Sequence, residues 1–281
     1  MPIVKLEQLL LDVKDNSYAI GSFNVSNMEM VLGTIKAAEE LHAPVIIQIA
    51  EGRLKYSPLH ALGPMMVAAA KEAKVPVAVH LDHGGTIEVI HQALEIGFTS
   101  VMFDGSQYPL DVNIEKTKQV KKLADKYNAS VEAEIGRVGG SEGDYANVDI
   151  MITSVDEAIK FYEATKVDAL AVAIGTVHGN YKEVPKLRID RLKEIAKVVN
   201  CPLVLHGGTG LTELDFRNSL ENGIKKINIA TASYDNVAQN VKKLAKDKPD
   251  FNYFDHTDTV MLATYENVKK HMFIFGLEGK A

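Results

Sequence analysis

Short apolar runs alternate with longer stretches of helical periodicity along the chain. Eight such runs stand at 19–25, 44–50, 75–82, 100–105, 130–136, 169–175, 202–208 and 226–231. Between them lie amphipathic segments that are long enough to cross back over a sheet, including 27–42, 85–96, 110–128, 154–165, 189–200 and 213–222. Strand and helix repeated eight times predict an α/β protein built as a parallel (β/α)8 TIM barrel.

A doubly wound open sheet would show the same alternation. Such a sheet more often carries a glycine-rich nucleotide fingerprint after its first strand, and GSFNVSN at 21–27 lacks the G-x-G-x-x-G spacing. We therefore favour the closed barrel. No composition break or Pro/Ser-rich linker divides the sequence, so we expect residues 1–281 to form a single domain.

Two segments fall outside the simple repeat. Residues 136–153 are too long and too rich in glycine for an ordinary connection, and they predict a mobile active-site loop. The tail at 249–281 predicts one further helix with a Met, Phe and Leu face. This C-terminal helix would either cap the barrel or form a dimer interface.

The charge balance narrows the range of partners. A formal charge of −6 and a pI near 5.9 give no general reason to bind nucleic acid or an anionic membrane. The sequence starts without the features of a signal peptide, has one cysteine, and lacks an 18-residue apolar stretch without charges. We expect a cytoplasmic protein that holds any anion in a local pocket.

Polar residues concentrate where the predicted strands end. In a (β/α)8 barrel, the carboxyl ends of the strands form the site. The polar residues at or just beyond these ends are Asn24, Asp82, His83, Asp104, Glu132, Glu134, His178, His206 and Asn228. The residues that begin the strands are mostly unreactive: Ala19, Pro44, Val75, Ser100, Ser130, Ala169, Pro202 and Lys226. This asymmetry predicts a functional site at one rim.

Three of the polar residues are histidines beside glycine, namely His83, His178 and His206. Three neutral imidazoles from separate strands can bind zinc and leave a fourth position for substrate. Their spacing matches no local zinc motif, so only the barrel can bring them together. His80 lies inside its strand and is either structural or a supporting partner of the site. The remaining histidines, which we expect to be solvated, are His42, His60, His91, His256 and His271.

The last two connections have the composition of a phosphate site. Gly207-Gly208-Thr209-Gly210 follows the seventh run, and residues 228–231 lead into a helix that begins near Ser233. These are the loops where such barrels commonly hold a phosphate on backbone N–H groups and a helix N-terminus. Lys182 could add a point charge. Cys201 opens the seventh strand, remote from the site, and is expected to be a small buried hydrophobe.

Five motifs resemble those of the class II, metal-dependent ketose-bisphosphate aldolases, which include fructose-1,6- and tagatose-1,6-bisphosphate aldolases. They are HLDHG (80–84), VEAEIGRVGG-x-E (131–142), AVAIGTVHG-x-YK (171–182), PLVLHGGTG (202–210) and KINIAT (226–231). The match runs over about residues 1–232, and the terminal FGLEGKA also resembles the family's ending. The order of the motifs makes the resemblance specific.

The resemblance implies a role for each matching residue. His83, His178 and His206 would bind one zinc ion, with Glu134 close to an alternative metal position. Asp82 would handle the proton on the C4 hydroxyl, and Glu142 would move the proton on the dihydroxyacetone phosphate carbon. The residues that would hold the substrate are Asn24, Gly179, Lys182, Gly207, Gly208, Thr209, Asn228 and Thr231. A monovalent cation near the phosphate is also common in the family.

The chemistry of aldol cleavage needs these residue types. Breaking the C3–C4 bond requires a base for the C4 hydroxyl and a group that stabilises the electrons left on C3, which zinc can do as a Lewis acid. A Schiff-base lysine is the other solution. The run 169–175 has no lysine, and Lys225 and Lys226 stand at the wrong end of the last strand. The sequence therefore favours the metal route.

Two departures from the family pattern affect the substrate. Ala230 replaces an aspartate that many fructose-bisphosphate aldolases carry, which favours tagatose-type or relaxed specificity. Lys280 stands where relatives often place an arginine for the second phosphate. We expect zinc-dependent, reversible cleavage of tagatose- or fructose-1,6-bisphosphate to dihydroxyacetone phosphate and glyceraldehyde 3-phosphate.

Other functions stay open at this point. The chain could be an aldolase for another phosphorylated keto sugar or keto acid, such as an inositol-breakdown intermediate, or a non-catalytic aldolase-like subunit. A zinc hydrolase of the amidohydrolase type would show His-x-His on the first strand, and FNV at 23–25 does not. We expect a homodimer or homotetramer.

Overall fold

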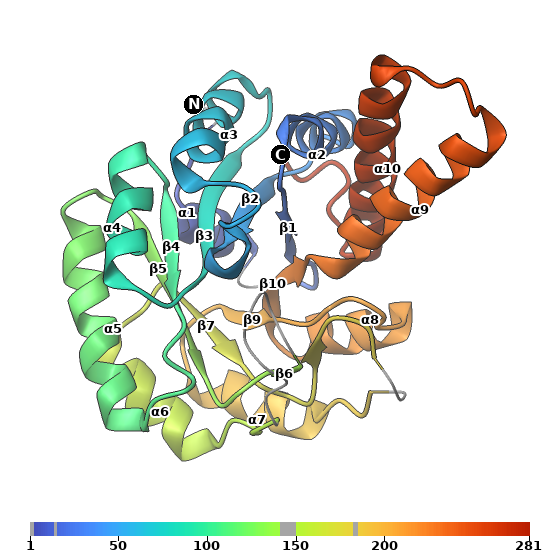
Figure 1. Ribbon diagram of the computed structural model, residues 1–281. Helices are drawn as coiled ribbons and strands as arrows, with labels where there is room; N and C mark the ends of the chain where they lie inside the picture. The colour runs from blue at the N-terminus through green and yellow to red at the C-terminus, as the bar shows by residue number, and fades with distance from the viewer. Residues whose placement is uncertain (1–2, 14–15, 141–149, 182–184) are drawn as a thin grey trace.

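The computed structural model describes residues 3–13, 16–140, 150–181 and 185–281 (Figure 1). Eight parallel strands close a barrel in the order β1-β10-β9-β7-β5-β4-β3-β2. Their bounds are β1 Ile20–Asn24, β2 Val45–Ala50, β3 Val77–Gly84, β4 Ser100–Phe103, β5 Ser130–Ile135, β7 Ala169–Val172, β9 Leu203–Leu205 and β10 Ile224–Ile229. The predicted (β/α)8 barrel is confirmed.

Helices surround the barrel, and in Figure 1 they form its outer layer. Their bounds are α1 Leu6–Val13, α2 Met28–Glu40, α3 Leu59–Glu72, α4 Ile87–Ile96, α5 Leu110–Asp125, α6 Val155–Thr165, α7 Ile189–Val198, α8 Glu213–Glu221, α9 Thr231–Asp247 and α10 Tyr253–Ile274. A 3-10 turn, η1 (Glu51–Arg53), follows β2. No helix in the described part of the chain has the length and apolar character needed to cross a membrane.

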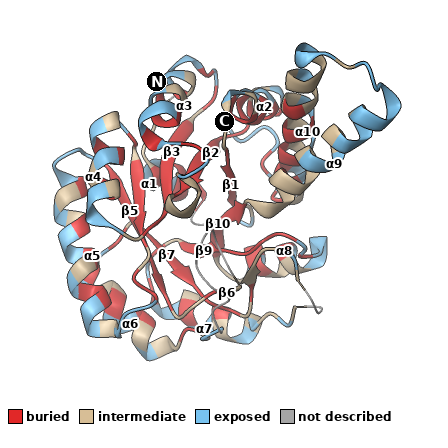
Figure 2. Ribbon diagram, viewed as in Figure 1, coloured by how far each residue is buried: buried red, intermediate tan, exposed pale blue. Residues whose placement is uncertain are grey.

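The barrel strands form because their short runs are buried on both faces. Every residue of the eight barrel strands is buried, and Figure 2 shows this continuous core inside the partly exposed helices. The register aligns polar residues among the apolar ones: Asn24 pairs with Gln48, and Ala50 pairs with Asp82. The parallel register therefore brings the polar carboxyl ends of the strands to one rim.

Side-chain caps begin several of the helices where the sequence leaves a strand. Asn27 caps α2 and Thr86 caps α4. Ser154 and Thr212 form capping boxes at the starts of α6 and α8. Each cap satisfies an N–H group that the first helical turn leaves without a partner. The caps therefore fix where each connection ends and its helix begins.

The structure differs from the predicted elements in three places. A two-stranded ladder of β6 (Gly139–Gly140) and β8 (Val177–His178) forms where only loops were expected. Helix α1 was not predicted. Strand β10 begins at Ile224 rather than at Lys226, so Lys226 lies within the strand, and its side chain is fully buried. The prediction that Lys226 stands apart at an unreactive strand start is wrong.

The C-terminal tail forms α10 as expected, and α10 packs along α2 and α9 (Figure 1). Helix α9 buries only Ser233, whereas α10 buries seven residues. The backbone N–H of Ala19, just before β1, donates to the carbonyl of Phe275, 3.3 Å away. Helix α10 therefore belongs to the helical layer beside β1.

Candidate active site

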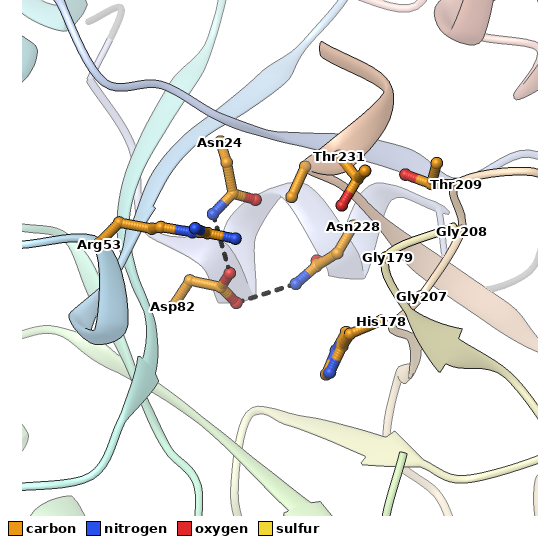
Figure 3. A pocket seen from close by; sticks show the side chains of 11 residues that line it. Asn24, Arg53, Asp82, His178, Gly179, Gly207, Gly208, Thr209, Asn228 and Thr231 are labelled. Carbon is orange, nitrogen blue, oxygen red and sulfur yellow. Dashed lines mark hydrogen bonds between the residues drawn. The ribbon is translucent and has the colours of Figure 1, made fainter. Parts of the chain in front are cut away.

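A pocket of about 340 Å³, a volume that includes space open to solvent, opens beside the ends of the strands. The residues that line it are Asn24, Arg53, Asp82, His178, Gly179, Gly207, Gly208, Thr209, Asn228, Ala230 and Thr231 (Figure 3). Most of the residues predicted from the sequence to bind substrate are among them. Segments more than two hundred residues apart in the sequence thus form one cavity.

The three predicted histidine ligands meet beside this pocket. His83, His178 and His206 each offer a ring nitrogen, and these atoms lie within 4.8 Å of one another. The ring centroids of His83 lie 4.8 Å from His178 and 4.6 Å from His206. His83 has a backbone φ of 45°, which is rare for a residue with a side chain and typical of functional sites. The fold therefore brings together imidazoles that no local motif joins.

Carboxylates orient two of these rings. Nδ1 of His83 lies 2.9 Å from Oδ2 of Asp104, and Nε2 of His206 lies 2.9 Å from Oε1 of Glu132. Each carboxylate accepts, so each ring carries its hydrogen on that nitrogen and keeps the other as an electron-pair donor. The two remaining nitrogens, His83 Nε2 and His206 Nδ1, face each other at 2.7 Å. This donor set fits a metal ion bound by three histidines.

The electrostatics keep this set ready to bind a cation. Burial would raise the pKa of the Glu132 carboxyl, but the ammonium of Lys226, 2.9 Å away, holds the pKa below its usual range. Burial and the neighbouring His83 lower the pKa of His206. A charged carboxylate and a neutral imidazole are the forms that a metal centre needs.

Glu134 belongs to a second cluster, with His83 and Asp104, that could also hold a metal. Its Oε1 accepts from the N–H of Val138 at 3.2 Å, while its buried Oε2 has no hydrogen-bond partner among the described residues. Burial and the charge of Asp104 raise the pKa of Glu134 well above its usual value. This orphaned oxygen fits the alternative metal position that the family resemblance implies.

Two amides hold the Asp82 carboxylate. Asn24 Nδ2 donates to Oδ2 at 3.1 Å, and Asn228 Nδ2 donates to Oδ1 at 2.9 Å (Figure 3). Gln48 Nε2 donates to Asn24 Oδ1 at 2.7 Å, and Lys226 Nζ donates to Asn228 Oδ1 at 2.7 Å. These donors turn the NH₂ groups of both asparagines toward Asp82. The carboxylate is therefore fixed in its orientation at the pocket.

The glycine-rich loop after β9 is held close to its neighbours. Gly207 has a φ of 70°, and a Cβ there would lie 2.4 Å from the carbonyl oxygen of Val177. The hydroxyl of Tyr181 donates to the Gly207 carbonyl at 2.8 Å. Thr209 Oγ1 accepts from the N–H of Ala232 at 3.0 Å, which joins the loop to the start of α9. A phosphate in this pocket would meet the positive end of that helix.

Several predicted residues have other outcomes. Glu142 and Lys182 lie outside the described residues. His80 is fully buried, with Nδ1 2.9 Å from Ser100 Oγ, and is absent from the metal-ligating groups found among the described residues. His271 is not solvated: it is buried, and burial lowers its pKa to about 4. Cys201 is buried, as predicted.

Several residues of the site had no role predicted from the sequence. Gln48 and Lys226 interrupt buried strands, and that interruption was a usable signal. Glu132 was predicted at a strand end, but its ion pair with Lys226 was not. Arg53 follows β2 in a polar turn and gave no signal. Lys226 pairs with Glu132 and does not line the pocket, so it offers no amine there for a Schiff base.

Comparisons with known proteins agree with this geometry. Residues 4–280 match the profile of the family described as "Fructose-bisphosphate aldolase class-II". The chain is 37% identical over 285 residues to a fructose-bisphosphate aldolase of Staphylococcus aureus (strain Mu50), and the alignment covers all of both chains. The chain is also similar to the crystal structure of the YdjI aldolase from Escherichia coli K12, with a TM-score of 0.88, 35% identity and 99% of each chain covered.

Proposed function

We propose that this chain, which belongs to the class II fructose-bisphosphate aldolase family, catalyses the zinc-dependent, reversible aldol cleavage of a ketose 1,6-bisphosphate. The products are dihydroxyacetone phosphate and glyceraldehyde 3-phosphate. Members of this family are metal-dependent lyases. The observation that carries the proposal is the meeting of Asp82, three facing imidazoles and a glycine-rich loop at one pocket.

His83, His178 and His206 would hold the zinc ion, because one ring nitrogen of each converges on the same point and two of the rings are fixed by carboxylates. A bound zinc ion would supply Lewis acidity for the negative charge that develops on the dihydroxyacetone half when the C3–C4 bond breaks. Glu134 supports an alternative position for the ion.

Asp82 is the base for the C4 hydroxyl. Its carboxylate takes the hydroxyl proton, the C4 oxygen forms a carbonyl, and the electrons of the C3–C4 bond remain on the dihydroxyacetone half. Asn24 and Asn228 hold both carboxylate oxygens, so the base does not have to find its orientation during the reaction. In the condensation direction the protonated Asp82 returns the proton.

The phosphate of the dihydroxyacetone half would bind at the glycine-rich side of the pocket. Gly179, Gly207, Gly208, Thr209 and Thr231 line that side, and the start of α9 adds its positive end. Lys182 and a monovalent cation would add positive charge there. Glu142 would close over the substrate and protonate C3 while excluding water.

Ala230 lines the pocket, which supports tagatose-type or relaxed specificity because the side chain offers no carboxylate to a substrate hydroxyl.

An oligomer of identical subunits is part of the same proposal. The apolar side chains of Tyr253 and Phe254 are 70% and 72% exposed at the start of α10, which gives such an assembly a surface to bury.

A coupled assay with fructose- and tagatose-1,6-bisphosphate side by side tests the function. We expect zinc-dependent release of dihydroxyacetone phosphate, with tagatose bisphosphate cleaved at least as well as its epimer. A chelator should abolish turnover, and added zinc should restore it. Turnover that persists under chelation contradicts the mechanism. A folded, zinc-loaded protein that cleaves neither sugar contradicts the function and favours a non-catalytic subunit.

A further inference from the structure

Arg53 brings a permanent positive charge to the pocket. Of the eleven described residues that line the cavity, it is the only arginine or lysine. It lies at the end of η1, directly after β2, and reaches toward Asp82 in Figure 3. The reaction at C3 and C4 gives this guanidinium no task, because Asp82 and the histidines already supply the base and the metal ligands.

The turn that carries Arg53 is fixed in place. The Glu51 carboxylate accepts from the N–H groups of Gly85 and Thr86 at 2.7 and 3.1 Å, and from the Thr86 hydroxyl at 2.8 Å. The guanidinium lies over the Tyr234 ring, 5.8 Å from its centroid. Arg53 is therefore held at the pocket before any ligand arrives, which lowers the entropic cost of binding.

Among the residues that the structure describes, the guanidinium has no anionic partner in an ion pair. Its Nε is buried without a hydrogen-bond partner, and the side chain forms no ion pair with any residue that the structure describes. Ala230, which lines the same cavity, has no carboxylate to offer. Buried donors in folded proteins are nearly always paired, so an orphaned one at a cavity indicates a ligand.

The barrel order places Arg53 across the pocket from the glycine-rich side. Strands four steps apart in an eight-stranded barrel lie opposite each other, and β2 is four steps from β7, which leads into β8 and Gly179. Asp82, on the neighbouring strand β3, lies beside Arg53 in Figure 3, and the glycines lie on the opposite side of the pocket. A ketose with its dihydroxyacetone phosphate half on the glycine side extends its aldehyde half toward Arg53.

We propose that Arg53 is a specificity-determining residue that binds an oxyanion, phosphate or carboxylate, at the aldehyde end of the ketose. This inference rests on the proposed function. A guanidinium can donate two parallel N–H bonds to either group, so it would select anionic aldehydes over neutral ones without acting on the bond that breaks.

Condensation with dihydroxyacetone phosphate tests the proposal, because the aldehyde can then be varied alone. Glyceraldehyde 3-phosphate, an aldehyde of similar length that ends in a carboxylate, and neutral glyceraldehyde are compared for wild type, Arg53→Met and Arg53→Lys. Lys71→Met is the matched control, since Lys71 is exposed on α3 and does not line the pocket. Circular dichroism verifies that each variant is folded.

We expect Arg53→Met to lower kcat/KM roughly 10- to 100-fold for the preferred anionic aldehyde, the range for a lost charged hydrogen bond. Activity with neutral glyceraldehyde and the KM for dihydroxyacetone phosphate should not change, and Arg53→Lys should lose less. The anion that suffers the larger loss identifies the natural group. An equal loss with all three aldehydes, or no loss, overturns this inference alone. No condensation by the wild type with any aldehyde contradicts the proposed function as well.

Discussion

The buried ion pair of Lys226 and Glu132 should be essential to the stability of the barrel. Both side chains are fully buried, and Lys226 Nζ lies 2.9 Å from Glu132 Oε2. Lys226→Met keeps most of the length of the side chain and removes its charge. Glu132 is then left charged in the interior beside the rings of His206 and His80, at 2.9 and 3.6 Å, which are neutral when burial lowers their pKa.

The size of the effect follows from that burial. Removing one member of a buried ion pair costs roughly 3–5 kcal/mol, a large part of the roughly 5–15 kcal/mol that stabilises a typical fold. The double variant Lys226→Met/Glu132→Gln removes both charges and keeps an oxygen for His206. Its free energy of unfolding should therefore recover much of the loss. Lys226→Met should also lower kcat, because Lys226 orients the Asn228 amide that holds Asp82.

Urea unfolding of the zinc-free protein, followed by circular dichroism, measures these effects without a contribution from metal binding. Lys118→Met is the control, because Lys118 pairs with Glu115 on the exposed face of α5 and such a pair is worth about 0–1 kcal/mol. The reasoning is refuted if Lys226→Met unfolds at the wild-type urea concentration. It is also refuted if the double variant loses as much as the two single variants, Lys226→Met and Glu132→Gln, combined.

Four further substitutions test the site and the core. Asp82→Ala should keep zinc bound and abolish cleavage, whereas His206→Ala should lose both, as metal analysis and the coupled assay would show; a metal-free Asp82→Ala protein contradicts the separate roles. Gly207→Ala should lower the free energy of unfolding by roughly 1–3 kcal/mol and raise KM, because the new Cβ would collide with the Val177 carbonyl and the backbone φ is positive. Urea curves and kinetics that match those of wild type would contradict this prediction. Burial lowers the pKa of His271 from 6.5 to about 4, because the folded protein favours the neutral ring. The contribution of this neutral ring to the free energy of unfolding is complete above pH 6.5 and is lost as the pH falls toward 4. Between pH 6.5 and 4 the free energy of unfolding, measured by urea titration, should fall by roughly 3 kcal/mol more for wild type than for His271→Gln. Parallel curves of unfolding free energy against pH for the two proteins would contradict this.

The barrel and most of the site could be predicted because they depend on order along the chain. Strand ends recur with the repeat, so His83, His178 and His206 had to meet once the barrel closed. Lys225 and Lys226 show where this reasoning stops. Neighbouring residues of a strand point to opposite faces. Lys225 binds the Asn16 carbonyl, while Lys226 enters the barrel, and both faces are buried, so hydrophobicity cannot tell them apart.

His271 and Arg53 were missed for different reasons. His271 continues a helical stripe with Val260, Thr264 and Val268, so its burial could have been read from the three-and-four spacing of α10. The direction of Arg53 depends on contacts made by Glu51 with residues more than thirty positions away. A local pattern does not encode such a tether.

The tether of η1 also separates two tasks that the enzyme must perform. Glu51 fastens the turn to the loop after β3, so position 53 keeps its place at the pocket when its own side chain is changed. Natural variation or directed evolution at position 53 can then retarget the enzyme to a new aldehyde while the bond-breaking apparatus stays intact. Within this barrel, the specificity for the aldehyde can therefore change through a substitution in one turn.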